Sequence, residues 1–73
     1  MQGETMTFGA WLRGRRAERG QRQEVAAKAC QVGRHTWQSW EADKTHPKRI
    51  KHLVAIAAWA HTDSQEVLGL LPK

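Results

Sequence analysis

The chain has 73 residues, with 12 Lys and Arg against 7 Asp and Glu, so its formal net charge is +5. A chain of this length forms one small domain without room for a deep substrate cleft, because it buries only about 60% of the surface that its unfolded form exposes. Its positive charge attracts polyanions, which makes nucleic acid the first partner class and an anionic membrane surface the second.

Several features weaken the membrane alternative. No run approaches the ~18 consecutive apolar residues that a spanning helix needs. The amino-terminal residues do not show the basic and then apolar pattern of a secretory signal. The single cysteine, Cys30, cannot form an internal disulfide and fits a reducing compartment. We therefore expect a cytoplasmic protein without a membrane partner.

Apolar spacing predicts five short helices in one domain over residues 1–73, after a flexible amino terminus at residues 1–6. Phe8, Trp11 and Leu12 share one helical face. A threonine can cap the start of this segment and a glycine can end it, so the first helix is expected at residues 7–19.

The second segment, residues 23–30, is short and alanine-rich, and Val32 follows it as an apolar residue of the turn. Gly33 then permits a third helix from Arg34 to about Ala42. Together these two segments form a close pair of helices.

Pro47 separates the third helix from a fourth, because proline disfavours helical geometry in the residue before it. The fourth helix is expected to gather on one side Ile50, Leu53, Ile56, Ala57 and Ala60. A last helix, capped by Asp63 or Ser64 and ended by Pro72, carries Val67, Leu68, Leu70 and Leu71. No segment alternates as a strand does, so the predicted fold is an all-α bundle.

Trp37 and Trp40 lie on the same side of the third helix, because they are within about 60° of each other at 100° per residue. His35, Gln38 and Ser39 fall on the opposite side. The tryptophans are suited either to base stacking or to core packing. We expect core packing, since the alanine-rich second helix leaves volume that large side chains fill.

The stretch from Gly20 to Glu41, "GQRQEVAAKACQVGRHTWQSWE", resembles the helix-turn-helix of the lambda-repressor-like group, which includes phage repressors and Cro proteins. The matching positions are Gly20, Gln23, Ala27, Val32, Trp40 and Glu41. The resemblance implies five helices, with the helix-turn-helix at about residues 22–42. It also implies that the third helix lies in the DNA major groove and that the second crosses the DNA backbone.

The same resemblance implies roles for individual residues. Base edges are expected to meet Arg34, His35, Ser39 and, as an addition, Gln38. Arg16 and Glu41 fall where many members form an ion pair between the first and third helices. The sequence departs from the group's pattern at Arg15, Gln21, Gln31 and Gly33.

These residue types suit DNA recognition. Arg34 has the reach to bond guanine O6 and N7, with a phosphate contact or a solvated side chain as its alternatives. His35 can donate to or accept from a base edge. Phosphate contacts are expected from polar and basic residues around the third helix: Arg22, Gln23, Thr36, Lys44, His46, Lys48 and Arg49.

Catalytic and metal-binding patterns do not emerge. The histidines and the cysteine do not follow a zinc-binding spacing. Cys30 lies on the apolar side of its helix, as a small core residue does. We therefore expect no enzyme activity, no metal and no cofactor.

The leading hypothesis is a small transcriptional regulator that binds double-stranded DNA, a repressor of phage or mobile-element type in the nucleoid of a bacterial or phage-infected cell. A homodimer on a pseudo-palindromic operator is expected, because one helix-turn-helix contacts few base pairs. Candidates for the dimer contact are an outward-leaning Trp59 together with Leu68, Leu70 and Leu71. The alternative is a helix-turn-helix module that acts through a protein partner, as an antitoxin or a phage inhibitor does.

Overall fold

The computed structural model describes residues 6–72 of the chain, so the flexible terminus expected at residues 1–6 lies outside the described residues except for Met6. The described range contains five α-helices and no strand. The helices are α1 (Phe8–Glu18), α2 (Gln23–Ala29), α3 (Arg34–Glu41), α4 (Ile50–Ala60) and α5 (Ser64–Leu70). The all-α prediction is confirmed, and each predicted helix end with a stated residue falls within one residue of the observed one.

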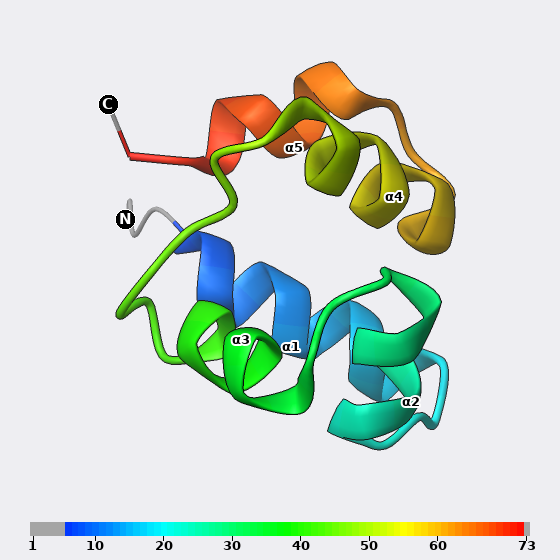
Figure 1. Cartoon of the computed structure of the whole chain (residues 1–73). Helices are drawn as coiled ribbons and strands as arrows, with labels where there is room; N and C mark the ends of the chain where they lie inside the picture. Colours follow the sequence, from blue (N-terminus) through cyan, green and yellow to red (C-terminus); the bar gives the residue numbers. More distant parts are fainter. Residues whose placement is uncertain (1–5, 73) are drawn as a thin grey trace, which may run out of the picture.

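The helices form two groups. α3 packs against both α1 and α2, while α4 packs against α5. Figure 1 shows α1, α2 and α3 in one half of the molecule and α4 and α5 in the other, joined along one side by the connection between α3 and α4. Within residues 6–72, no helix is long and apolar enough to cross a membrane.

Local signals set the ends of the helices. The Thr7 hydroxyl accepts a hydrogen bond from the Ala10 N–H at 3.1 Å, and this caps α1. Gly20, with φ of +64°, takes the left-handed conformation just after α1, which glycine adopts at little cost. The Asp63 carboxylate accepts from the Glu66 N–H at 2.8 Å and caps α5.

The core draws side chains from all five helices. Its largest members are aromatic and aliphatic: Phe8, Trp11, Leu12, Trp37, Trp40, Leu53, Ile56, Trp59 and Val67. Small side chains from α2, among them Ala26 and Ala27, and Cys30 beside it fill the remaining space. Burial raises the pKa of the Cys30 thiol to about 12, so the sulfur stays protonated at neutral pH.

Two expectations for α4 are wrong. Ile50 does not share the buried side, because it is the first residue of the helix and lies beyond the core, with 77% of its surface exposed. Trp59 does not lean outward; it is only 8% exposed. Its ring packs edge-on against Trp37, with 5.2 Å between ring centroids, and its indole N–H donates to Gln21 Oε1 at 2.9 Å. Trp59 therefore belongs to the core and is not available as a dimer contact.

Candidate nucleic-acid interface

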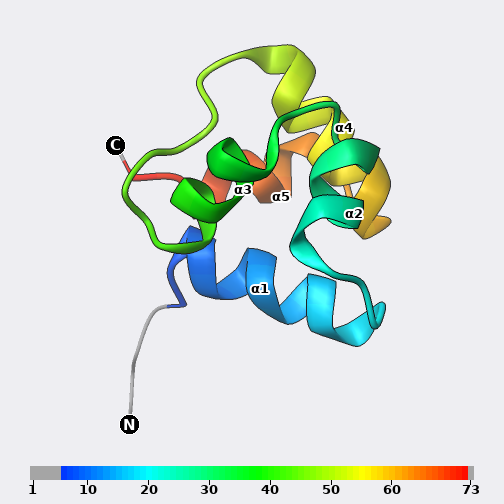
Figure 2. The ribbon, with the colours of Figure 1, turned by 60° about the horizontal axis from the view of Figure 1, so that its bottom comes forward.

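α3 presents one side to the core and the other to solvent. Trp37, Trp40 and Glu41 are buried against α1, α2 and α4. The buried tryptophans leave no exposed ring for base stacking. Figure 2 shows α3 lying across α1 with α2 beside it. The outward side of α3 carries exposed Arg34, His35 and Thr36, and half-buried Gln38 and Ser39.

A buried carboxylate holds α3 in this orientation. Glu41 accepts hydrogen bonds from Arg16 Nε at 2.6 Å and Arg16 Nη2 at 3.1 Å, so α1 and α3 are joined by a bidentate ion pair. Gln23 Nε2 of α2 donates to the same carboxylate at 3.1 Å, and the Trp37 indole N–H donates to it as well. One side chain therefore fixes the relative placement of three helices.

The charges at this site are mutually stabilised. Burial disfavours an ionised Glu41, but hydrogen bonds from Arg16, Gln23 and Trp37 outweigh it and hold the pKa of this carboxyl below its usual range. The hydrogen bond to Glu41 raises the pKa of Arg16. The pair stays charged at neutral pH, and Glu41 acts as an acceptor toward all its neighbours.

An open hollow of about 320 Å³ lies on the outward side of α3, lined by His35, Gln38, Ser39, Ala42 and Lys44. Three of the four residues expected to contact bases therefore share one concave surface. Arg34 is exposed in the first turn of the same helix. Ser39 and Ala42 contribute small side chains to the hollow, and the larger polar side chains of its lining are those of His35, Gln38 and Lys44.

The residues expected to contact phosphate lie on either side of α3. Arg22 is exposed at the N-cap of α2, and Thr36 is exposed on α3 itself. Lys44, Lys48 and Arg49 are exposed between α3 and α4. Gln23 is half-buried and bonded to Glu41, so part of its hydrogen-bonding capacity is used inside the protein.

His46 differs from the other expected phosphate ligands. Its Nε2 lies 3.2 Å from Asp43 Oδ1, and its ring meets the edge of the Phe8 ring at 5.9 Å between centroids. Asp43 Oδ1 also accepts the Gly9 N–H of α1 at 2.9 Å. His46 is therefore turned toward α1, and this placement argues against the phosphate contact predicted for it.

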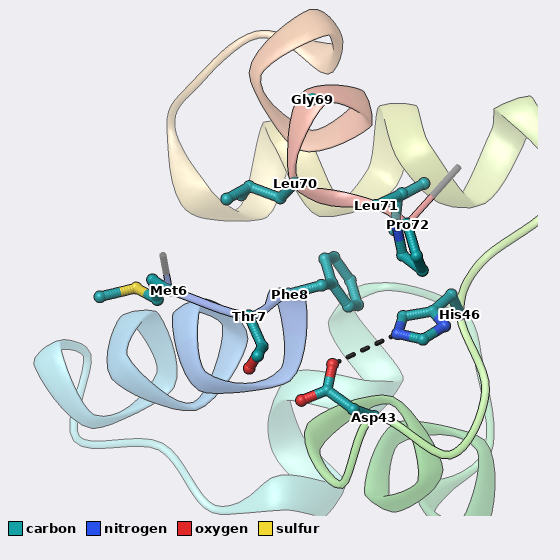
Figure 3. A pocket seen from close by; sticks show the side chains of 9 residues that line it. All are labelled: Met6, Thr7, Phe8, Asp43, His46, Gly69, Leu70, Leu71 and Pro72. Carbon is teal, nitrogen blue, oxygen red and sulfur yellow. Dashed lines mark hydrogen bonds and ion pairs between the residues drawn. The ribbon is translucent and has the colours of Figure 1, made fainter. Parts of the chain in front are cut away.

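Figure 3 shows the pocket beside this histidine, which residues from both ends of the described range line. Its volume is about 470 Å³, and its lining residues are Met6, Thr7, Phe8, Asp43, His46, Gly69, Leu70, Leu71 and Pro72. The Asp43 carboxylate at its rim already has hydrogen-bond partners within the protein. Although burial opposes its ionisation, hydrogen bonds from Gly9, Thr7 and His46 lower the pKa of Asp43. The pocket lies between the start of α1, the segment after α3 and the end of α5, and its walls are mainly apolar.

The remaining candidates for a dimer contact lie at the end of the chain. Leu70 and Leu71 pack partly against the core, whereas Leu68 is exposed on α5. Leu70 and Leu71 therefore contribute to closing the monomer core.

The sequence reasoning missed two structural contacts. Gln21, treated as a departure from the family pattern, accepts from Trp59 through its side chain and from Arg16 through its carbonyl. Asp43 joins the end of α3 to Gly9. The Asp43 contact spans 34 residues, and local sequence gives no signal for it. The Gln21 contact spans 38 residues, and local sequence gives no signal for it.

Residues 6–72 contain no group of three or more His, Cys, Asp or Glu side chains that could hold a metal ion.

Comparison with known proteins identifies the fold. The P22 c2 repressor protein, solved in complex with a synthetic operator, matches with a TM-score of 0.81 at 24% identity, over 90% of this chain and 98% of that one. The solution structure of the DNA-binding domain of the P22 c2 repressor matches with a TM-score of 0.78 at 24% identity, over 90% of this chain and 86% of that one. No curated protein sequence matches significantly. The family model of the helix-turn-helix domain matches residues 7–67. The chain belongs to this helix-turn-helix family and has the lambda-repressor-like fold.

Proposed function

We propose that this protein binds double-stranded DNA in a sequence-specific manner and acts as a small transcriptional repressor of phage or mobile-element type, not as an enzyme. The outward side of α3 carries the proposal. Two buried tryptophans and the hydrogen bonds of Glu41 with Arg16 and Gln23 fix the helix. Its outward side carries Arg34, His35, Gln38 and Ser39. A fixed helix with such a surface suits the major groove, which admits one α-helix. The P22 c2 repressor, which has the same fold, was solved with a synthetic operator.

The charges around α3 support contact with a duplex. Exposed Arg22 lies before α2, and Lys44, Lys48 and Arg49 lie after α3, so cations flank the helix on both sides. Such flanking cations contact phosphates and set the position of the protein on DNA. A protein with this function binds the nucleoid in the cytoplasm of a bacterial or phage-infected cell.

A homodimer on a pseudo-palindromic operator is part of the proposal. One helix-turn-helix reads a single half-site, and two copies about one helical turn apart supply the missing affinity and specificity. Exposed Leu68 on α5 remains a candidate for contact between the copies.

Selection of bound sequences from a random duplex library tests the proposal directly. We expect one enriched motif with two-fold symmetry, and we expect its affinity to fall steeply with salt because bound cations release counterions from the DNA. Failure to enrich any motif would contradict the proposal. An enriched motif without symmetry would contradict the dimer alone.

Arg34→Ala distinguishes sequence-specific recognition of bases from the nonspecific electrostatic attraction of the protein to DNA. Loss of a bidentate guanine contact is expected to cost about 1–3 kcal/mol at one base pair of each half-site. Arg13→Ala is the matched control, since Arg13 is an exposed arginine on α1. The control removes the same charge and is expected to leave the motif unchanged.

A further inference from the structure

The orientation of the Gln23 side chain is fixed from inside the protein. Its neighbour Glu41 is an ionised carboxylate, which accepts hydrogen bonds and donates none. The Gln23 amide must therefore turn its Nε2 toward Glu41, and the two atoms lie 3.1 Å apart. This orientation points the other end of the amide, Oε1, toward α3.

Gln38 is oriented by the same chain of contacts. Its Nε2 donates to Gln23 Oε1 at 3.2 Å. An amide oxygen only accepts, so Gln38 must turn its nitrogen toward Gln23. The two hydrogen bonds that link Glu41 to Gln23 and Gln23 to Gln38 therefore set the orientation of the Gln38 amide, and with it the positions of its donor and its acceptor.

The rest of the Gln38 amide remains for a partner. Nε2 has a second hydrogen, and within residues 6–72 the structure gives Oε1 no hydrogen-bond donor. Gln38 is half-buried and lines the open hollow on the outward side of α3, beside Ser39 and Ala42. The same amide thus retains one donor hydrogen and one acceptor oxygen at the surface expected to meet base edges.

This pattern is complementary to one base. In the major groove adenine offers a donor at N6 and an acceptor at N7, whereas guanine offers two acceptors and cytosine a donor alone. We propose that Gln38 recognises adenine, with Oε1 accepting from N6 and Nε2 donating to N7, and that Gln23 and Glu41 position its amide. The inference rests on the proposed function and adds the base that this residue selects.

The strongest test exchanges the donor for a second acceptor. Gln38→Glu has no N–H group, and a carboxylate pairs with the cytosine amino group. Sequence selection with this variant is expected to replace A by C at one base pair of each half-site. Gln38→Ala is expected to reduce preference at the same base pair roughly five- to hundred-fold without installing a new one. Thermal unfolding by circular dichroism verifies that both variants fold.

Gln23→Met tests the positioning role. Methionine keeps the length of the side chain but cannot orient the Gln38 amide. We expect the preference for adenine at the Gln38 base pair to weaken several-fold, while preferences elsewhere in the motif persist. If Gln23 contacts phosphate alone, affinity falls equally for all sequences and the preference is unchanged, which would overturn the positioning role.

The outcomes distinguish this inference from the function on which it rests. If the wild-type protein enriches no motif, the proposed function and the adenine assignment both fail. If the wild-type protein enriches a motif that Gln38→Glu and Gln38→Ala leave intact, DNA binding stands and the adenine assignment alone is wrong.

Discussion

α1 meets the end of α3 at two places, and both use a carboxylate. Toward the end of α1, Arg16 pairs with Glu41. The Arg16 side chain is 20% exposed and the Glu41 side chain is 6% exposed. At the start of α1, the Gly9 N–H donates to Asp43, which also pairs with His46. The Asp43 side chain is 32% exposed and the His46 side chain is 23% exposed. The first contact is removed from water and permanently charged. The second is partly hydrated, so each of its bonds competes with water.

The difference in exposure shows how two contacts of unequal strength hold the same helix. A buried charge costs far more to leave unpaired than a hydrated one, so the Glu41 contact is obligatory once α3 is folded. The Asp43 contact adds a weaker restraint two residues beyond the end of α3. Together they fix the direction in which the outward side of α3 faces.

The largest expected effect comes from breaking the buried contact. Glu41→Ala leaves the Arg16 guanidinium partly buried without its carboxylate, which costs about 3–5 kcal/mol. A domain of this size has only roughly 4–11 kcal/mol of stability, so the variant should be largely unfolded on mild heating. Urea unfolding followed by circular dichroism measures this. Glu18→Ala, at a carboxylate 70% exposed, is the control and should change stability little. A loss below about 1 kcal/mol for Glu41→Ala would remove the distinction between the two contacts.

The next effect comes from the space between α1 and α3. A Cβ added at Gly9 would lie 2.7 Å from both the Trp40 carbonyl oxygen and Asp43 Oδ2, and would also meet the Glu41 carbonyl oxygen. Backbone atoms cannot move aside cheaply, so Gly9→Ala is expected to destabilise the protein by about 1–3 kcal/mol.

Gly14 gives the matched control for Gly9 within the same helix. A Cβ at Gly14 meets nothing within 4 Å, so Gly14→Ala should stabilise the protein by up to about 1 kcal/mol through helix propensity. Thermal unfolding of the two variants is expected to shift in opposite directions. A shift in the same direction would mean that α1 does not approach the end of α3 this closely.

A smaller effect is expected at the partly hydrated contact. Asp43→Ala removes the acceptor of the Gly9 N–H and the partner of His46, which is expected to cost about 1 kcal/mol. Asp63→Ala sets the scale, because Asp63 caps α5 through the same kind of bond. Urea unfolding at neutral pH compares them. A cost for Asp43→Ala as large as that of Glu41→Ala would show that hydration does not separate the two contacts.

The sequence predicted the parts of this arrangement that depend on local pattern. Apolar spacing and capping residues located five helices, and the spacing of Trp37 and Trp40 placed both in the core. The resemblance to a family placed Arg16 opposite Glu41, and the structure has them paired. Contacts across long sequence separations were not predictable, because no local pattern specifies them. Trp59 reaching Gln21 and Asp43 reaching Gly9 are both of this kind. The sequence places His46 in a loop with Lys44, Lys48 and Arg49, whereas in the structure its ring packs against Phe8.

The smallest expected effect is the response of the hydrated contact to acid. The pKa of Asp43 is lowered in the folded protein, so its carboxylate stabilises the fold fully above the unfolded pKa of about 3.9. That contribution is lost as the pH falls through the lower folded pKa. The stability deficit of Asp43→Asn, which keeps the shape without the charge, should therefore shrink as the pH falls from about 5 toward 3. Urea unfolding of both proteins at intervals across this range measures the deficit. A deficit that does not change with pH would mean that Asp43 acts through its shape and its neutral hydrogen bonds, and the contrast with Glu41 would then rest on burial alone.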